Sequence, residues 1–370
     1  MQMDKQWYTC QEVAKLENIP LRTVQSRCAK GRYSCIKDGR DWKIHKVKYD
    51  KLKYDKLNRI DKSHIVLNNS TNNILVFTNS KGGVGKTTLS VLFADICASL
   101  GYKVLLVDNN GQGNSTTISD LMPFVGNGKP AKNQYTYGMH DVYLSQIYKQ
   151  IGHKPPIETN QVIFKAPKRE YFVLPSDYRL YQVKFWLLDN AHAFPSTKQL
   201  QTLWKMHFPY LLKYALEEIR DQFDFIIIDT PSSLDFETKN ALMAGTDVII
   251  PIELGLFEIL GLRKVMMFIE ECAKDNSALG VLGVVISRYG PTAANLDKDL
   301  ETAIRADPEI KNLVFETVIM KSLHIREATI EKQPFDKYWR SGLPKKVLDI
   351  YHDFTEELLL RVLRKRRLKK

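Results

Sequence analysis

The residues with the clearest chemical role lie in one glycine-rich segment, which reads KGGVGKTT from Lys81 to Thr88. The apolar run from Ile74 to Phe77 precedes it, and an apolar helical pattern follows it as far as Leu100. We therefore expect a strand, a loop and a helix in that order. Glycines let backbone amides approach phosphate oxygens, and the start of the helix adds partial positive charge. The segment predicts a site for ATP with Mg²⁺, and the alternative of a glycine-rich turn without function fits the spacing and context less well.

Two side chains of this loop have specific expected roles. Lys86 should contact the β- and γ-phosphates, and the hydroxyl of Thr87 should bind Mg²⁺. The other loop residues are expected to surround the phosphates. The complete set of expected nucleotide-binding residues is Lys81, Gly82, Gly83, Val84, Gly85, Lys86, Thr87 and Thr88.

The loop also carries a second lysine, Lys81, ahead of its glycines. In this respect KGGVGKTT resembles the deviant Walker A motif of the ParA/MinD family of ATPases. The resemblance implies that this lysine reaches across an ATP-sandwiched homodimer to the nucleotide of the other subunit. Lys81 is thus the candidate for the contact between subunits, and dimerisation is expected to depend on ATP.

Two further segments are similar to motifs of this family. Residues 104–114 resemble its second-strand motif, and residues 225–232 resemble its Walker B and switch segment. Both are apolar runs of the parallel-strand type, and each ends its apolar part in an acid, which places Asp108 and Asp229 at the carboxyl edge of an α/β sheet. Asp229 is expected to hold Mg²⁺ through water; acids that merely end strands are the alternative.

The resemblance covers about residues 72–360 and implies an α/β fold, a mostly parallel sheet of the P-loop NTPase type. Residues 246–252 and 282–288 are apolar runs that would continue this sheet, and residues 314–319, followed by residues 325–328, resemble the carboxyl-terminal portion of the family. The stretch from Gly126 to Leu203 fits poorly, so an insertion is expected there. The expected domains are residues 1–60, with a charged linker to about residue 73, and an ATPase domain over residues 74–370.

One position departs from the family pattern in a way that bears on hydrolysis. The second-strand motif normally reads D-x-D-P-Q-G-N, but here Asn110 stands at the second aspartate and Gly111 at the proline. Asparagine can orient a water through its carbonyl oxygen, but it accepts no proton near neutral pH. Slow ATP hydrolysis is therefore expected, unless Asp108 substitutes. The expected catalytic residues are Lys81, Asp108 and Asn110.

The amino-terminal segment predicts a small separate domain. Thr9 and Glu12 have the spacing of a capping box, which starts a helix, and a second helix is expected from Leu21 to Lys30. The dipeptide Asp38-Gly39 lies between two short runs and suits a two-residue hairpin. Two helices followed by a hairpin make a helix-turn-helix with a wing.

Residues 7–48 resemble the winged helix-turn-helix of MerR-like and excisionase-like DNA-binding domains. In such domains the second helix enters the major groove. The alternative is a small basic domain that packs against a protein partner. The expected DNA-binding residues are Arg22, Thr23, Gln25, Ser26 and Arg27 on the helix, followed by Lys30, Arg32 and Arg40, which would contact the phosphate backbone.

Charge and composition agree with an anionic partner. The chain has 370 residues and a formal net charge of +12, and its hydrophobic content of 44% is ordinary for a soluble protein. The excess is concentrated at the two ends, because residues 1–62 hold 16 Lys and Arg against 8 Asp and Glu, and the last ten residues hold seven basic groups. Such ends attract phosphate backbones or acidic membranes. The five scattered cysteines, without a C-x-x-C pair, argue against a zinc site or a disulfide framework and favour a reducing cytoplasm.

The carboxyl-terminal tail leaves three alternatives open. Residues 353–363 look helical, with Phe354, Leu358, Leu359 and Val362 spaced as a core-facing stripe, and a basic run follows from Arg364 to Lys370. A solvated basic end is the plainest interpretation. Nucleic-acid contact comes next, and a membrane-surface helix is less favoured, since the apolar residues stop where the basic run begins.

Taken together, these resemblances imply a cytoplasmic partition ATPase associated with nucleoid or plasmid DNA, similar to the partition ATPases that carry an amino-terminal DNA-binding domain. In that class ATP closes the dimer, the dimer binds DNA, and a ParB-like centromere-binding partner stimulates hydrolysis. The fused domain would add operator recognition at an inverted repeat, and so autoregulation. The alternatives are a transcription or replication regulator in which ATP is only a ligand, a MinD-like membrane-surface ATPase, and a metabolic enzyme on the same scaffold.

Overall fold

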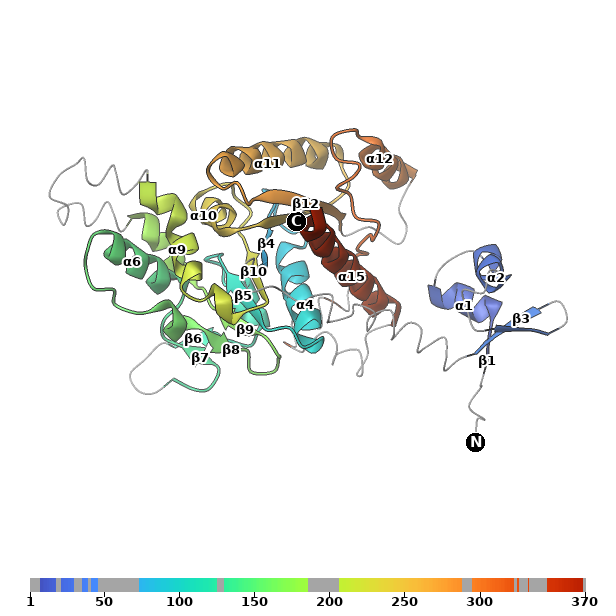
Figure 1. Ribbon diagram of the computed structural model, residues 1–370, viewed down its shortest axis with the longest axis horizontal. Coiled ribbons are helices and arrows are strands. Elements are labelled where there is room, and N and C mark those ends of the chain that lie inside the picture. Colours follow the sequence, from blue (N-terminus) through green and yellow to red (C-terminus); the bar gives the residue numbers. More distant parts are fainter. Residues whose placement is uncertain are drawn as a thin grey trace. The chain divides into compact units, whose positions relative to one another are not determined.

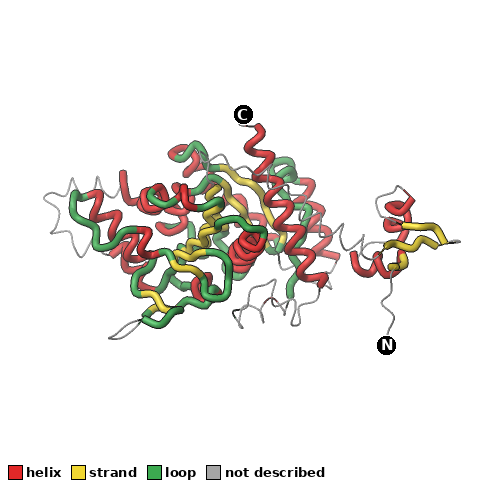
Figure 2. The backbone as a smooth tube through the Cα atoms, turned by 60° about the horizontal axis from the view of Figure 1, so that its bottom comes forward, coloured by secondary structure: helices red, strands yellow, loops and turns green. Residues whose placement is uncertain are grey.

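A computed structural model describes residues 7–17, 21–29, 35–38, 41–45, 73–124, 130–185, 206–287, 295–322, 325, 332 and 345–368. The chain divides into two compact units, Met1–Val66 and Leu67–Lys370. Figures 1 and 2 show both units, and each is described here by itself.

The amino-terminal unit contains two short helices and a small antiparallel sheet of strand order β1-β3-β2. The predicted capping box is confirmed, because the Thr9 amide donates to Glu12 Oε2 over 2.7 Å and the Glu12 amide donates to Thr9 Oγ1 over 3.2 Å. Val13 and Val24 are fully buried between the helices. The elements are β1 (Trp7–Thr9), α1 (Cys10–Glu17), α2 (Leu21–Ala29), β2 (Cys35–Asp38) and β3 (Asp41–His45).

The expected pair of helices and the expected hairpin strands are thus present, and the strand β1 was not anticipated. The described part of the second helix is Leu21–Ala29, and the expected last residue, Lys30, lies outside the described residues. Whether this unit reads DNA as a winged helix-turn-helix stays a prediction.

The larger unit is built on a seven-stranded sheet of order β12-β11-β4-β10-β5-β9-β8. Every pairing in it is parallel except that of β8 with β9, so the expected mostly parallel sheet is confirmed. The strands are β4 (Asn73–Phe77), β5 (Val104–Asp108), β8 (Phe164–Lys165), β9 (Phe172–Leu174), β10 (Phe225–Asp229), β11 (Asp247–Ile252) and β12 (Gly280–Ile286).

The apolar composition of the central strands follows from their burial on both faces. All residues of β4, β5 and β10 are buried, which is why these runs lack the alternation of a half-exposed strand. On one face Phe93 packs against the rings of Phe77 and Phe225, with ring centroids 6.4 Å and 5.9 Å apart. The other face carries Ile74, Val76 and their neighbours into the main hydrophobic core.

Helices cover both faces of this sheet, as Figure 1 shows for the larger unit. The right-handed crossover from β4 to β5 puts its helix on one face, and the crossovers that lead back to β10, β11 and β12 put theirs on the other. Contacts agree with this division. On the first face lie α4 (Lys86–Ser99) and α15 (Lys345–Leu368), and on the second lie α6 (Met139–Gln150), α9 (Leu211–Glu217), α10 (Phe236–Ala244) and α11 (Leu256–Asp275).

Shorter elements complete the unit. They are α5 (Asn114–Ile118), β6 (Met122–Pro123), β7 (Gln134–Tyr135), α12 (Asn295–Ala306) and the 3₁₀ turns η1 (Thr159–Val162), η2 (Tyr178–Gln182), η5 (Phe208–Tyr210) and η6 (Arg220–Gln222).

The stretch in which an insertion was expected is partly integrated into the sheet. Within residues 130–185, β9 pairs with β5 and β8 continues the edge, while α6 packs on α9. Residues 130–185 are therefore part of the larger unit, although their sequence fits the family poorly. Residues 125–129 and 186–205 lie outside the described residues.

The carboxyl-terminal helix α15 confirms the expected apolar stripe, because Phe354, Leu358, Leu359 and Val362 are all buried. The expectation of a solvated basic end is wrong for one residue of the basic run. Lys365 donates to Asp247 Oδ1 over 2.7 Å and to the carbonyl of Thr246 over 2.9 Å, so it is paired within the fold. In the part of the chain that the structure describes, no helix has the length and hydropathy needed to cross a membrane.

Candidate nucleotide-binding site

The glycine-rich loop joins β4 to α4, as the sequence predicts. Gly85 caps α4 with a φ of +94°, a conformation that residues with a Cβ rarely adopt, and the helix begins at Lys86. The Lys86 ammonium donates to the carbonyl of Lys81 over 2.9 Å and to Ser232 Oγ over 2.7 Å. Lys86 therefore spans the loop from the first residue of α4 and meets the segment that follows β10.

Two buried side chains that the sequence interpretation overlooked hold this loop in shape. Asn79 donates to the carbonyl of Pro251 over 2.7 Å and accepts from the amide of Lys81 over 3.1 Å. Ser287 donates to the carbonyls of Val84 and Ile252. Both side chains anchor the loop to the ends of neighbouring strands. Because Asn79 and Ser287 each follow a strand in the sequence, their positions could have suggested this role.

The environment of Lys86 favours a ligand of negative charge. Burial lowers the pKa of Lys86 to about 8, although the nearby carboxylate of Asp229 acts in the opposite direction. A buried cation that lacks full compensation gains most from an anion placed against it. The loop thus has the electrostatic character expected of a phosphate site.

Asp108 and Asp229 lie next to each other at the carboxyl edge of the sheet, as predicted. They are register partners on the parallel strands β5 and β10, and both are fully buried. Burial raises the pKa of both carboxyls, and the neighbouring charge of Asp229 raises that of Asp108 further. Among the described residues, the Oδ1 atom of each carboxylate has no hydrogen-bond partner.

The residues around Asp229 fit a magnesium ion. Its Oδ1 is a buried oxygen without a hydrogen-bond partner among the described residues. Burial raises the pKa of Asp229, and hydrogen bonds from Ser115 and then from Thr87 oppose that rise, so the two expected metal-binding groups adjoin each other. Magnesium keeps several waters and takes few protein ligands beside nucleotide phosphates. No group of three or more His, Cys, Asp or Glu suited to a metal occurs in the described part of the chain.

Lys81 is held within its own chain. Its side chain is 43% exposed, and its ammonium is paired with Glu258 and, over 3.2 Å, with Glu253. The hydrogen bond with Glu258 is the largest cause that raises the pKa of Lys81. Gly255 leaves the space for this arrangement, because a Cβ there would overlap the carboxylate of Glu258.

Asn110 lies in a tight turn directly after β5. Its Oδ1 accepts from the amide of Gln112 over 3.1 Å, and its carbonyl accepts from the amide of Gly113 over 2.9 Å. The residue is 7% exposed. The preceding Asn109 is fixed by Tyr143, whose hydroxyl donates to it over 2.9 Å, and by the carbonyl of Glu237.

The sequence matches a known protein family over the residues that form this site. A family model described as an AAA domain (AAA_31) matches residues 72–281, which is more than half of the chain. The chain belongs to this AAA domain family. The match includes the glycine-rich loop, Asp108 and Asp229.

The proteins that this AAA domain protein is similar to include a chromosome-partitioning ATPase. The chromosome-partitioning ATPase Soj of Treponema pallidum is 28% identical over 265 residues, which cover 71% of this chain and 89% of Soj. A structure from Borrelia burgdorferi, described as a plasmid partition protein bound to AMPPNP, has a TM-score of 0.55 at 21% identity and covers 80% of this chain and 100% of its own. MinD of Pyrococcus horikoshii, complexed with Mg-ADP, has a TM-score of 0.54 at 19% identity and covers 76% and 94%. The predicted ParA/MinD-type ATPase fold is therefore confirmed.

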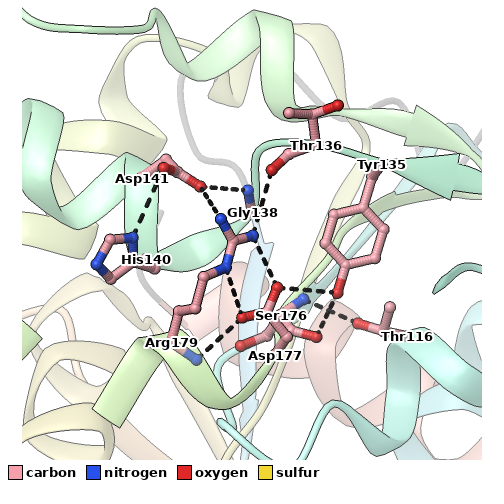
Figure 3. A network of polar contacts seen from close by, with 9 residues as sticks. All are labelled: Thr116, Tyr135, Thr136, Gly138, His140, Asp141, Ser176, Asp177 and Arg179. Atoms are coloured by element: carbon pink, nitrogen blue, oxygen red, sulfur yellow. Dashed lines mark hydrogen bonds and ion pairs between the residues drawn. The ribbon is translucent and has the colours of Figure 1, made fainter. Parts of the chain in front are cut away.

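A polar network of the AAA domain, which the sequence interpretation missed, joins Thr116 to residues 135–179 (Figure 3), and Thr116 links it to Asp108. Thr116 donates to Asp108 Oδ2 through its amide over 2.8 Å and through its hydroxyl over 2.7 Å. The same hydroxyl accepts from the amide of Ser176 over 2.9 Å, and the Ser176 carbonyl accepts from Tyr135 over 2.8 Å. The one sequence signal for this network is that Thr116 lies close to Asp108 along the chain.

The residues predicted to bind DNA are only partly described. Arg22 is exposed on α2 and Gln25 is half-buried. Thr23, Ser26 and Arg27 lie in α2 without described side chains, and Lys30, Arg32 and Arg40 lie outside the described residues.

Proposed function

We propose that this protein is an ATP-dependent, dimeric partition ATPase that acts on DNA. The observation that carries the proposal is the buried Lys86 at the head of α4, which lies in reach of Ser232 and of the charge of Asp229. Family membership and the likeness to Soj support it. ATP and Mg²⁺ are the ligands, in keeping with the nucleotide complexes of the two similar structures.

Each group of the site has a part in binding and hydrolysis. The backbone of residues 82–85 and the ammonium of Lys86 neutralise the β- and γ-phosphates, while Thr87 and, through water, Asp229 hold Mg²⁺. When bound, magnesium supplies further positive charge against the phosphate oxygens. Asn110 orients the attacking water through its amide oxygen, with Asp108 beside it. Since an amide does not accept a proton near neutral pH, hydrolysis is slow.

The proposed dimerisation uses Lys81, whose side chain is partly exposed. Its ammonium is paired with Glu253, which is also partly exposed, and with Glu258, which is half-buried, and solvent at Lys81 screens and weakens both pairs. The triphosphate of a second subunit is a stronger partner for a lysine, because it carries more charge. ATP therefore draws Lys81 across the interface of a homodimer.

The amino-terminal unit supplies specific DNA contacts, with Arg22, Thr23, Gln25, Ser26 and Arg27 at the groove and Lys30, Arg32 and Arg40 on phosphates. Its basic excess of 16 Lys and Arg over 8 Asp and Glu in residues 1–62 supports this role. The ATP-bound dimer adds nonspecific DNA contact and a ParB-like partner stimulates it. The protein acts in the cytoplasm, on nucleoid or plasmid DNA.

A second candidate function is a transcription or replication regulator that uses ATP as a conformational ligand. Asn110 favours it, because the residue removes the acid expected to position water. The two functions differ in turnover, since a partition ATPase hydrolyses ATP faster when its partner and DNA are present. A MinD-like membrane ATPase is disfavoured by Lys365, which is paired with Asp247 instead of being available to lipid.

The test is salt-dependent binding of duplex DNA by the full-length protein and by a truncated protein that begins at Asn72, each with ATP, ADP or no nucleotide. We expect both to bind random-sequence DNA with ATP, and only the full-length protein to select an inverted repeat. Arg22→Ala in the full-length protein should weaken the preference for the inverted repeat by about 1 to 3 kcal/mol. Absence of DNA binding by both proteins in every nucleotide state would refute the proposal.

A further inference from the structure

Residues 176–181 pack against the turn that carries Asn110 at two glycines. Gly113 has a φ of +63°, and a Cβ on it would lie 2.7 Å from the carbonyl oxygen of Ser176. A Cβ on Gly111 would lie 2.7 Å from two ring carbons of Tyr181. Real Cβ atoms do not approach neighbours so closely, so the ring of Tyr181 occupies the space that a side chain at position 111 would need.

Tyr181 is also hydrogen-bonded to this turn. Its hydroxyl accepts from Gln112 Nε2 over 3.1 Å, and the amide of the same Gln112 donates to Asn110 Oδ1 over 3.1 Å. Gln112 thus connects the hydroxyl of Tyr181 to the side chain of Asn110 by two hydrogen bonds. Tyr181 contacts the turn by ring packing at Gly111 and by its hydroxyl at Gln112.

The turn η2, which carries Tyr181, is itself rigidly held. Asp177 caps it by accepting from the amide and the Nε atom of Arg179, each over 2.9 Å, and the Arg179 guanidinium reaches on to the carbonyl of Thr136 over 3.3 Å (Figure 3). Ser176 ties the start of the turn to Thr116, which also donates to Asp108. The ring of Tyr181 is therefore presented to the turn by a structured support, although it remains 36% exposed.

We propose that Tyr181 is a positioning residue for ATP hydrolysis, which holds the turn from Asn110 to Gln112 in the conformation that aims the Asn110 amide. This inference rests on the proposed function of Asn110 as the group that orients water. An amide that cannot take the proton contributes only by its placement, so its effect depends strongly on geometry. A freely moving turn would lose that contribution while leaving the phosphate-binding loop intact.

The test compares steady-state kcat and KM for ATP among Tyr181→Phe, Tyr181→Ala, Gly111→Ala and the double variant. Loss of the hydroxyl alone should lower kcat by a few-fold, and Tyr181→Ala should lower it by about tenfold or more. Gly111→Ala should lower it similarly, because the new methyl group displaces the ring. The double variant should be no slower than Tyr181→Ala alone, since the methyl then enters vacated space and the two effects are not additive. KM for ATP should change by less than about twofold, because Lys86 and its loop are untouched.

Tyr178→Ala is the matched control, because Tyr178 lies on the same turn, is 69% exposed and should have no effect. An unchanged or raised kcat in Tyr181→Ala and Gly111→Ala, a loss confined to KM, or multiplicative losses in the double variant would overturn the inference. If wild-type turnover is below detection, the same series is measured in the Asn110→Asp background with the same expected ratios. Failure of the wild-type protein to bind ATP would instead overturn the proposed function, so the two failures are distinguishable.

Discussion

Asp108 and Asp229 end adjacent parallel strands in direct register, and both carboxyl groups are fully buried at the edge of the sheet that faces the glycine-rich loop. Two acids in such a place repel each other once both are ionised, and burial penalises the charge of each. The raised pKa of Asp108 avoids this repulsion by keeping its carboxyl neutral, and a magnesium ion, as a cation, is expected to favour the ionised forms of both acids.

Asp108→Asn should stabilise the nucleotide-free protein, and the gain should grow with pH. The pKa of Asp108 is raised in the folded state by burial and by Asp229. At low pH the carboxyl is protonated in both the folded and the unfolded state, so its burial carries no cost of ionisation. As pH rises through the folded pKa, the cost of the buried charge lowers the free energy of unfolding. We expect a gain of about 1 kcal/mol or more at pH 8, seen as a melting temperature a few degrees higher.

At pH 4 this stabilising effect should vanish. Asp221→Asn, at a side chain that is 74% exposed, is the control and should change stability little at either pH. An equal effect of Asp108→Asn at both pH values would contradict the assignment of a raised pKa to this carboxyl.

The affinity for ATP should fall as pH rises above about 8. Burial lowers the pKa of Lys86 to about 8 in the absence of ligand, so above that pH ATP must bind with uptake of a proton or meet a neutral amine. The Kd for ATP with Mg²⁺, measured by calorimetry, should rise by up to about tenfold per pH unit between pH 8 and 10. Lys86→Ala carries no titrating group at this position, and its weak binding should vary little over the same range. A Kd for the wild-type protein that is flat from pH 7 to 10 would show that Lys86 does not titrate there.

The buried ion pair of Arg169 and Asp95 should be important for stability. The two side chains are 0% and 3% exposed and in direct contact, and Arg169 also donates to the carbonyl of Ile118 over 3.1 Å. Asp95→Ala leaves a buried guanidinium without its carboxylate, which should cost about 3 to 5 kcal/mol in the free energy of unfolding. Chemical denaturation measures this cost.

Glu170→Ala provides a comparison one residue away from Arg169. The pair of Lys165 and Glu170 is exposed on both sides, at 45% and 69%, and should contribute no more than about 1 kcal/mol. Similar losses in the free energy of unfolding for Asp95→Ala and Glu170→Ala would mean that the buried ion pair contributes no more to stability than the exposed one.

Asn110→Asp should accelerate ATP hydrolysis by about tenfold to a hundredfold, because an acid at this position can accept a proton from the attacking water. Affinity for ATP should change little, since Asn110 lies outside the phosphate-binding loop. Single-turnover hydrolysis at saturating ATP separates the chemical step from binding. A wild-type rate already as high as that of the variant would mean that the asparagine imposes no limit.

The sequence predicted those parts of the site whose geometry is local. The order of strand, loop and helix around Lys86 depends on one short segment, and the place of Asp229 on the strand that it ends, so spacing was sufficient for both. The roles of Lys86, Thr87 and Asp229 in binding stay predictions. The capping box of Thr9 and Glu12 is equally local, and the structure contains it.

The contacts that join distant segments could not be predicted. Thr116 and Ser176 are 60 residues apart, and Gln112 and Tyr181 are 69 apart, with no motif to connect them. Strands β8 and β9 have two and three residues, which is too short for an alternation pattern to emerge. The pairing of Lys81 with Glu253 and Glu258 likewise depends on how β11 and α11 meet the loop.

The most direct test of the account is calorimetric titration of the full-length protein with ATP and Mg²⁺ at pH 7.5, beside Lys86→Ala and Thr87→Ala. The wild-type protein should bind one nucleotide per subunit, Lys86→Ala should bind at least about tenfold more weakly, and Thr87→Ala should lose the dependence of affinity on Mg²⁺. A wild-type protein without affinity for Mg-ATP, or a Lys86→Ala protein that binds it equally well, would contradict the account.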